Sequence, residues 1–228
     1  MPDTSAVIVA AGAGERLGVG VPKAFVELAG EPLVLRCVRV LARVVDSVVC
    51  VVAADHRERA EQLLDTAGAG DVRLAIGGET RQDSVSAGLA ACPPSTRVVA
   101  VHDAARPLLS EELARRTLDA LQPPWDGVAP GLPLVDTIKL VDPQGKVLRT
   151  VDRRGMWAVQ TPQVFPRAVL ERVHARVASD ADAATDDLSL VERAGGRVRL
   201  VRGERRNLKI TYPEDLALAE ALLAAEPT

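Results

Sequence analysis

Aromatic side chains are scarce in this chain: two tryptophans, two phenylalanines and one tyrosine make up 2% of its 228 residues. Proteins that bind single-stranded nucleic acid commonly stack the bases on such rings, so this class of function is disfavoured. The scarcity also constrains the interior. Because 47% of the residues are hydrophobic and few are rings, the core has to be built from alanine, valine and leucine.

An excess of positive charge is also missing. The formal net charge is −3 at pH 7, and the isoelectric point is about 5.7. Both values argue against general affinity for nucleic acid or for an anionic membrane surface. Any cationic site in this protein must therefore be local.

No segment has the length and apolar character of a transmembrane helix. The longest apolar segment, residues 33–45, is interrupted by arginines. The N-terminal residues MPDTSAVIVAAG carry no basic region ahead of the apolar run, so we expect no signal peptide. We therefore predict a cytoplasmic protein without a membrane partner.

Cysteine is rare as well. Cys37, Cys50 and Cys92 are odd in number and far apart in the chain, without the spacing of a metal site. We expect three reduced, buried thiols, which suits a cytoplasmic protein.

What the chain does contain is a regular alternation of two patterns. Continuous apolar runs predict strands that are covered on both faces, and apolar residues at helical spacing predict helices between them. This order indicates an α/β protein, residues 1–228 in a single domain, with a mostly parallel sheet and helices on both faces. The expected strands are residues 5–10, 47–54, 72–77, 97–106 and 197–203, and the expected helices are residues 33–44, 56–67, 83–91, 110–121, 166–177 and 213–225.

The alternation is interrupted between residues 133 and 156. Two strand-like segments, VDTIKLVD and KVLRTVDR, flank Pro-Gln-Gly, which predicts a β-hairpin with its turn at DPQG. The hairpin is too long and too polar to belong to the buried sheet. We therefore expect an arm that projects from the domain, and arms of this kind commonly contact a partner subunit.

The first expected strand leads into a glycine-rich loop with the sequence VIVAAGAGERLGVGVPKAF, residues 7–25. The dinucleotide fingerprint needs a glycine where this loop has Leu17, and the P-loop needs Gly-Lys-Ser/Thr where this loop has Pro-Lys-Ala. The loop carries two cations instead, Arg16 and Lys23. The planar guanidinium group of an arginine and the compact ammonium group of a lysine are together suited to bind a polyphosphate. A glycine turn with two solvated surface cations is the alternative interpretation.

A second segment is expected to border the same site. Ligands of open parallel sheets bind beyond the carboxyl ends of the strands. The segment HDAARP, residues 102–107, follows a later buried strand, so it and the glycine-rich loop should border one crevice.

Several separated segments resemble one known family. AAGAGERL followed by PK resembles the signature of the sugar-nucleotide pyrophosphorylase superfamily. Together with GGETRQDSVSAGL, VHDAARP, DTIK, TVDRRGMWAVQTPQ, ATDD and NLKITYPEDL, it resembles the 2-C-methyl-D-erythritol 4-phosphate cytidylyltransferase family of non-mevalonate isoprenoid synthesis. The resemblance covers nearly the whole chain. It implies a Rossmann-like nucleotidyltransferase domain in which the arm, residues 133–156, is a dimerisation element.

The resemblance implies one reaction. A phosphate oxygen of methylerythritol phosphate attacks the α-phosphorus of CTP in line, and pyrophosphate leaves. No covalent enzyme intermediate is implied, which agrees with the absence of a convincing triad from the sequence. Catalysis would consist of positioning and electrostatic stabilisation. Mg²⁺ would bridge the CTP phosphates, without a dedicated cage of protein ligands.

The resemblance also implies roles for particular residues. The catalytic residues would be Arg16, Lys23, Arg153 and Lys209. The nucleotide would contact Ala10, Ala11, Gly12, Gly14, Gly78, Ser84, Asp103 and Ala104. The acceptor would contact Arg106, Thr137, Thr161 and Thr185. Arg153 and Thr137 would reach the acceptor from the arm, across a homodimer, and Lys209 would hold the acceptor phosphate for attack.

Some of these positions have simpler interpretations on the sequence alone. Asp103 suits a turn or a helix cap as well as a ligand, and Arg106 suits an ion pair with a neighbouring carboxylate. His102 is expected to be a packed strand residue and not a catalyst. Arg154 competes with Arg153 for the same role. The part played by Glu79, where the family often has aspartate, stays open.

Two other functions remain possible on the sequence. A cytidylyltransferase of the same build, acting on ribitol 5-phosphate or a related polyol phosphate, would share the fold and the nucleotide loop. A non-catalytic nucleotide-sensing module would be expected to have lost Arg16, Lys23 or Lys209, and all three are present.

Overall fold

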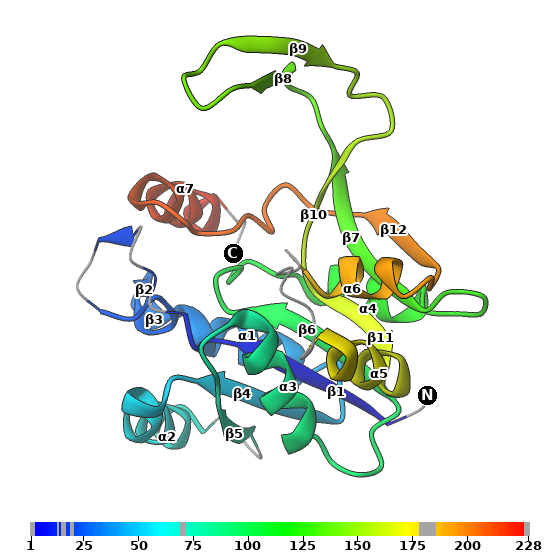
Figure 1. Ribbon diagram of the computed structural model, residues 1–228. Helices are drawn as coiled ribbons and strands as arrows, with labels where there is room; N and C mark the ends of the chain where they lie inside the picture. Colours follow the sequence, from blue (N-terminus) through cyan, green and yellow to red (C-terminus); the bar gives the residue numbers. More distant parts are fainter. Residues whose placement is uncertain are drawn as a thin grey trace.

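The structure of the protein is a computed structural model that describes residues 3–12, 14, 17–18, 21–68, 72–177 and 186–225. It contains a central sheet with helices on both faces and a long hairpin that extends away from that body (Figure 1). Two residues with a predicted role, Arg16 and Thr185, lie outside the described residues.

A mixed eight-stranded sheet forms the centre of the molecule. Its strands are β1 (Thr4–Val9), β4 (Ser47–Val52), β5 (Val72–Ile76), β6 (Val98–Asp103), β7 (Gly127–Pro133), β10 (Trp157–Val159), β11 (Gln163–Pro166) and β12 (Val198–Arg202). The order is β10-β7-β11-β6-β1-β4-β5, and β12 pairs with β7. Strands β5, β4, β1 and β6 are parallel neighbours, as are β7 and β12, whereas β10 and β11 are antiparallel to theirs. The predicted α/β class with a mostly parallel sheet is confirmed.

Six of the seven helices of the described residues lie where the sequence predicted a helix, and α6 was not predicted. They are α1 (Leu33–Leu41), α2 (Arg57–Thr66), α3 (Arg81–Ala91), α4 (Glu111–Asp119), α5 (Arg167–Val177), α6 (Asp187–Arg193) and α7 (Pro213–Ala224). Ser110 precedes α4, and its hydroxyl accepts a hydrogen bond from the backbone N–H of Leu113 at 3.0 Å. This N-cap satisfies one of the free N–H groups at the helix start and fixes where α4 begins.

Strand β1 separates the two main cores of the protein. Ala6 and Ile8 face one side, where they pack with residues of α1, α2 and α4. Val7 faces the other side and packs with residues of α3, α5 and α6. Because successive side chains of a strand point to opposite faces, a continuous apolar run is buried on both. A smaller cluster that includes Leu28 and Ile210 lies under α7.

The predicted hairpin is a separate two-stranded antiparallel sheet, β8 (Ile138–Val141) with β9 (Val147–Val151). Its turn is closed by a hydrogen bond from the N–H of Gly145 to the carbonyl of Asp142 at 3.0 Å. In Figure 1 the hairpin lies beyond the ends of β7 and β10, away from the body of the protein. A short pair, β2 (Glu27–Leu28) and β3 (Glu31–Pro32), precedes α1.

The three cysteines are buried and free, as the sequence suggested. Burial raises the pKa of Cys50 to about 12, so this thiol stays protonated at neutral pH. None of the described helices is long and apolar enough to cross a membrane.

Candidate active site

A pocket of about 360 Å³ lies where β1 and β6 end. Its walls come from the glycine-rich loop after β1, the 3₁₀ turn η2 (Lys23–Phe25), the segment before α3, the residues after β6 and the segment before α7. This is the carboxyl edge of parallel strands, where the sequence placed the crevice. Ten residues with a predicted role line the pocket: Ala10, Ala11, Gly12, Gly14, Lys23, Gly78, Ser84, Asp103, Ala104 and Lys209.

Glycine and lysine of the loop motif pack directly against each other. Gly14 has a φ of +72°, and a Cβ atom added to it would lie 2.4 Å from the Cβ of Lys23. No other residue type fits there, because the backbone is left-handed and the space is already filled. The glycine therefore allows the loop to pass close over Lys23, which is why the motif needs glycine at position 14.

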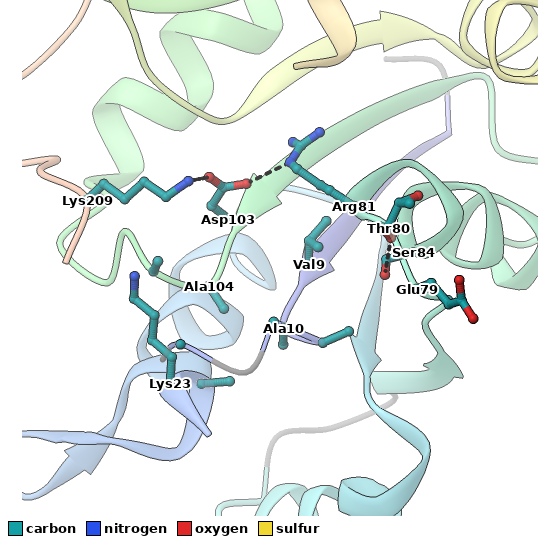
Figure 2. A pocket seen from close by; sticks show the side chains of 16 residues that line it. Val9, Ala10, Lys23, Glu79, Thr80, Arg81, Ser84, Asp103, Ala104 and Lys209 are labelled. Carbon is teal, nitrogen blue, oxygen red and sulfur yellow. Dashed lines mark hydrogen bonds and ion pairs between the residues drawn. The ribbon is translucent and has the colours of Figure 1, made fainter. Parts of the chain in front are cut away.

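Asp103 is the central charge of the pocket. It is the last residue of β6, and its carboxylate accepts hydrogen bonds from Lys209 Nζ at 2.8 Å and from Arg81 Nε at 3.3 Å (Figure 2). Burial by itself would raise the pKa of Asp103. The charges of Arg81 and Lys209 outweigh burial and hold that pKa well below its usual range, so the carboxylate is ionised at neutral pH.

The two lysines of the pocket reach it from opposite ends of the chain. Lys209 is fixed by its neighbour Ile210, whose N–H donates to the carbonyl of Ala105 at 2.8 Å. The Lys209 side chain is 43% exposed, so its ammonium group is accessible from solvent. Figure 2 shows Lys23 extending its ammonium group toward the side of the pocket where Lys209 and Asp103 lie.

The segment before α3 is held close to the loop by its glycines. A Cβ atom on Gly77 would lie 2.6 Å from Ser84 Oγ and 2.7 Å from the Cβ of Ala11. Ser84 is buried, and its hydroxyl donates to the carbonyl of Thr80 at 3.0 Å. The exposed Glu79 side chain points away from Asp103 and the lysines in Figure 2, so its carboxylate does not join that charge cluster.

Thr161 lies beneath the pocket and not on its lining. Its Oγ1 accepts from the N–H of Asp103 at 3.1 Å and lies 3.0 Å from Nδ1 of His102, while Nε2 of His102 lies 3.2 Å from the carbonyl of Arg106. A neutral His102 with its proton on Nε2 satisfies all of these bonds. Burial lowers the pKa of His102 to about 4, which agrees with a neutral ring. His102 is thus a packed strand residue, as expected.

Arg106 also lies outside the pocket lining. Its guanidinium donates to the carbonyl of Asn207 at 2.8 Å and to that of Val159 at 3.3 Å. In this structure it therefore connects the segment after β6 to the end of β10 and to the segment before α7, and burial lowers its pKa. A direct contact with substrate stays a prediction for this residue.

Thr137 and Arg153 lie on the arm, as predicted, and both are exposed. Neither lines the pocket of its own chain. The Arg153 guanidinium donates to the carbonyl of Val135, whereas Arg154 donates to both oxygens of Asp152, at 2.8 Å from Nε to Oδ2. The charge of Arg154 is thus already paired with a carboxylate, which favours Arg153 among the two candidates.

The residues that sequence reasoning missed are Arg81 and Asp187. Arg81, the first residue of α3, lines the pocket and connects Asp103 to the buried Asp187, 2.6 Å from its Nη1. Burial by itself would raise the pKa of Asp187, but the hydrogen bond from His174 and the charge of Arg81 lower it. Both residues belong to segments that carry the family resemblance, GGETRQDS and ATDD, but neither segment indicates that the two residues pair.

The side chains of the pocket limit how a metal ion could be held there. Among the residues that the structure describes, no group of three or more histidine, cysteine, aspartate or glutamate side chains could hold one. Asp103 is already shared by two cations. The described residues therefore fit a divalent ion only if the bound ligand supplies most of its oxygen ligands.

The arrangement favours electrostatic chemistry. Two lysines face a cleft lined by small residues, where a phosphate chain can approach the backbone closely. The Ser84 hydroxyl donates to the backbone carbonyl of Thr80, and among the described residues no hydrogen bond joins it to a histidine or carboxylate that would activate it. The pocket can thus bind and neutralise a polyphosphate without forming a covalent intermediate.

Comparison with known proteins indicates the same family that the sequence segments resemble. The model of the 2-C-methyl-D-erythritol 4-phosphate cytidylyltransferase (IspD) family matches residues 4–225. A bifunctional IspD/IspF enzyme of Clavibacter michiganensis is 46% identical over 99% of this chain, which spans 55% of that protein, about half its length. A 2-C-methyl-D-erythritol 4-phosphate cytidylyltransferase of Streptomyces coelicolor is 44% identical over 97% of this chain and 85% of its own.

Comparison with a solved structure shows that the likeness extends to the fold. The crystal structure of 4-diphosphocytidyl-2C-methyl-D-erythritol synthase from Anaerococcus prevotii is 30% identical and superposes with a TM-score of 0.84. The match covers 97% of this chain and 98% of that one. The fold, the position of the pocket and the family match over nearly the whole length agree, and the chain belongs to the 2-C-methyl-D-erythritol 4-phosphate cytidylyltransferase family.

Proposed function

We propose that this protein transfers the cytidylyl group of CTP to 2-C-methyl-D-erythritol 4-phosphate and releases pyrophosphate, a step of isoprenoid precursor synthesis. The observation that carries the proposal is the pocket at the ends of β1 and β6, where Lys23, Lys209 and Asp103 gather in a chain of this family. Its relatives are named for this acceptor, which favours it over ribitol 5-phosphate.

The reaction needs little covalent participation from the protein. A phosphate oxygen of the acceptor forms a bond to the α-phosphorus of CTP, and the bond from that phosphorus to the pyrophosphate oxygen breaks. Pyrophosphate leaves with the electron pair. Negative charge builds up on the transferring phosphoryl group and on the leaving pyrophosphate, so fixed cations nearby lower the barrier.

Lys23 and Arg16 are the cations that we assign to the triphosphate and the departing pyrophosphate. The position of Lys23 in the pocket lining, against Gly14 of the glycine-rich loop, supports this assignment. Ala10, Ala11, Gly12 and Gly14 would present backbone close to the ligand, because their own side chains are a methyl group or a hydrogen atom.

Lys209 is the residue that we assign to the acceptor phosphate. Its ammonium group lies at Asp103 on the open side of the pocket, where an incoming phosphate would meet it. Asp103 would keep this ammonium in place and face the nucleotide. The small pocket wall of Gly78, Ser84 and Ala104 would surround the cytosine and ribose.

We further propose that the reaction uses Mg²⁺, which would be held mainly by the CTP phosphates and not by a cage of protein side chains. The limited donor set of the described residues supports a cation that is held largely by phosphate oxygens. The ion would supply Lewis-acid neutralisation of the phosphate charge. The protein would contribute the lysines and the backbone cradle around that charge.

We infer that the protein is a homodimer formed through the arm. Among the described residues, eleven large hydrophobic side chains are exposed, and eight of them lie between residues 135 and 159. Such a concentration of apolar surface is typical of an interface. Arg153 and Thr137 lie outside the pocket of their own chain, so an arm that crosses to the partner would bring them to the partner's pocket.

The test is a product assay on the purified full chain. CTP and Mg²⁺ are supplied with either 2-C-methyl-D-erythritol 4-phosphate or ribitol 5-phosphate, and the cytidylylated product is identified by mass spectrometry together with released pyrophosphate. We expect product with the first acceptor only. Product with ribitol 5-phosphate alone would favour the other cytidylyltransferase, and CTP binding without pyrophosphate release would favour a sensing module.

A further inference from the structure

A network of polar side chains continues from the pocket into the interior of the protein. Asp103 of β6 contacts Arg81 of α3 at 3.3 Å, Arg81 contacts Asp187 of α6 at 2.6 Å, and Asp187 contacts His174 of α5 at 2.9 Å. The network returns to α3 at Ser86, whose hydroxyl oxygen lies 3.1 Å from Nδ1 of His174. Four separate elements therefore meet through charged or polar groups immediately behind the pocket.

The inner part of this network is removed from solvent. Asp187 is 0% exposed and His174 is 8% exposed. Taking an ionised carboxylate out of water is costly, and apolar residues of similar volume often fill such a place with equal or better stability. Stability alone therefore does not account for the pair of Asp187 and His174 at this position.

The geometry of Arg81 gives the pair another role. Its Nη1 contacts Asp187, and its Nε contacts Asp103. A guanidinium group is planar and rigid, so fixing Nη1 on one carboxylate also fixes the direction in which the Nε–H bond points. The Arg81 side chain is 28% exposed and lies between the pocket and the interior. Asp187 thereby sets how Arg81 presents its donor to Asp103.

Asp187 is itself held in one orientation. Oδ1 accepts from His174 Nε2 and Oδ2 accepts from Arg81, so both carboxylate oxygens are engaged. The backbone N–H of Asp187 donates to Oε1 of Gln163 in β11 at 3.1 Å, and Nε2 of the same glutamine donates to Asp186 at 2.7 Å. The start of α6 is thus anchored to the central sheet, next to the strand that carries Asp103.

We propose that Asp187 and His174 are positioning residues for cytidylyl transfer. Acting through Arg81, they orient the carboxylate of Asp103, and through it the ammonium group of Lys209, 2.8 Å from the other carboxylate oxygen. Neither residue lines the pocket, so neither contacts a ligand bound there. The inference rests on the proposed function, in which Asp103 and Lys209 face the reacting groups.

The first test is Asp187→Asn in the full chain, with kcat and KM measured for both substrates. We expect kcat to fall about tenfold or more, since small misplacements of reacting groups are costly. The KM for CTP should change less than about threefold, because the backbone cradle of the loop does not depend on Arg81. Val173→Ala is the matched control: this buried neighbour of His174 packs in the core, so its loss lowers stability and leaves kcat unchanged.

A second pair of variants decides the matter if Asp187→Asn does not fold. Glutamine can place an N–H donor near the position of Nε2 of histidine, whereas alanine cannot. We therefore expect His174→Ala to lower kcat about tenfold and His174→Gln to keep most of it. Equal losses in both variants, or no loss in either, would overturn the positioning role.

The route through Arg81 is tested by combining variants. Lysine keeps the charge of Arg81 but has a single ammonium group that cannot hold two carboxylates in the same way. In an Arg81→Lys background, His174→Ala should lower kcat little further, whereas additive losses would contradict the proposed route. An unaltered protein that forms no product refutes the proposed function, and an active protein whose variants retain full kcat refutes only the positioning role.

Discussion

At the scale of single residues, one side chain of the pocket can pack through one of its atoms and carry its charge on another. Lys23 shows this most clearly, because its Cβ fills the space left by Gly14 while its ammonium group extends into the pocket. Removing the charge but keeping the Cβ should therefore preserve the loop. In Asp103 charge and contacts cannot be separated, because the charged carboxylate itself accepts hydrogen bonds from Arg81 and Lys209.

Lys23→Ala should lower kcat by about 10²- to 10³-fold, since it removes one fixed cation from the site where charge develops. Thermal unfolding should change little, because the contact with Gly14 involves the Cβ that alanine retains. The measurement is steady-state pyrophosphate release together with a melting curve. Arg57→Ala, which removes an exposed cation paired with Glu61 on α2, is the control and should keep full activity. Turnover near the unaltered level in Lys23→Ala would contradict the role given to its charge.

His102 should make the protein sensitive to mild acid. Its pKa is lowered to about 4 by burial, against about 6.5 in an unfolded chain. Between these two values the unfolded chain binds a proton that the folded protein does not, so stability falls as pH decreases through this window. The loss from this residue should be about 2 kcal/mol between pH 7 and pH 5.

Chemical denaturation at both pH values, in the unaltered protein and in His102→Gln, measures that contribution. Glutamine does not titrate. The free energy of unfolding of His102→Gln should therefore decrease between pH 7 and pH 5 by about 2 kcal/mol less than that of the unaltered protein. An equal decrease in both proteins would mean that His102 is not the group responsible.

The candidate site was predictable to the extent that its residues follow strand ends. Lys23 and Asp103 could be placed at one crevice because parallel strands end at the same edge of the sheet, whereas Lys209 was expected there only from the family resemblance. The pairing of Arg81 with Asp187 could not, because these residues are 106 positions apart and meet only because α3 and α6 both pack against α5. No local pattern in either segment encodes that contact.

At the scale of elements, strands β1, β4, β5, β6 and β12 were predictable, whereas β7, β10 and β11 were not. Strands β1, β4 and β6 are apolar runs rich in valine that are buried on both faces. Strand β7 has the sequence GVAPGLP, whose glycines and prolines argue against a strand. Pro130 is accommodated there because its carbonyl accepts from the N–H of Gln160, a bond that needs no N–H from proline.

Helix α3 carries a packing constraint that the sequence showed only as small residues. A Cβ atom on Gly88 would lie 2.4 Å from Cγ1 of Val7 and 2.9 Å from Cγ2 of Val51. The glycine thus lets α3 lie directly on β1 and β4, although glycine weakens a helix by about 1 kcal/mol relative to alanine. Close packing of this helix brings Arg81 and Ser84, at its beginning, to the pocket.

At the scale of the whole molecule, the body and the arm have different surfaces. The body buries its valines and leucines in two cores on either side of the sheet. The arm exposes Leu148 by 57% and Val147 by 53%, on a hairpin that is separate from the main sheet. An isolated two-stranded hairpin gains little stability by itself in water, so its apolar side chains are better explained by contact with a second copy.

Leu148→Asp should therefore convert the proposed dimer into monomers, because it would place a charge in the apolar surface through which we propose that the arm contacts a second copy. The fold of each chain should be retained, since an exposed side chain contributes within about 0.5 kcal/mol to the stability of its own chain. Sedimentation velocity at micromolar concentration measures the mass, and Leu218→Asp on α7, where the leucine is 52% exposed, is the matched control that should stay dimeric. Activity should fall together with association, because Arg153 and Thr137 would no longer reach the partner's pocket. A fully active monomer, from either the variant or the unaltered chain, would show that each pocket is complete without the arm of a second copy.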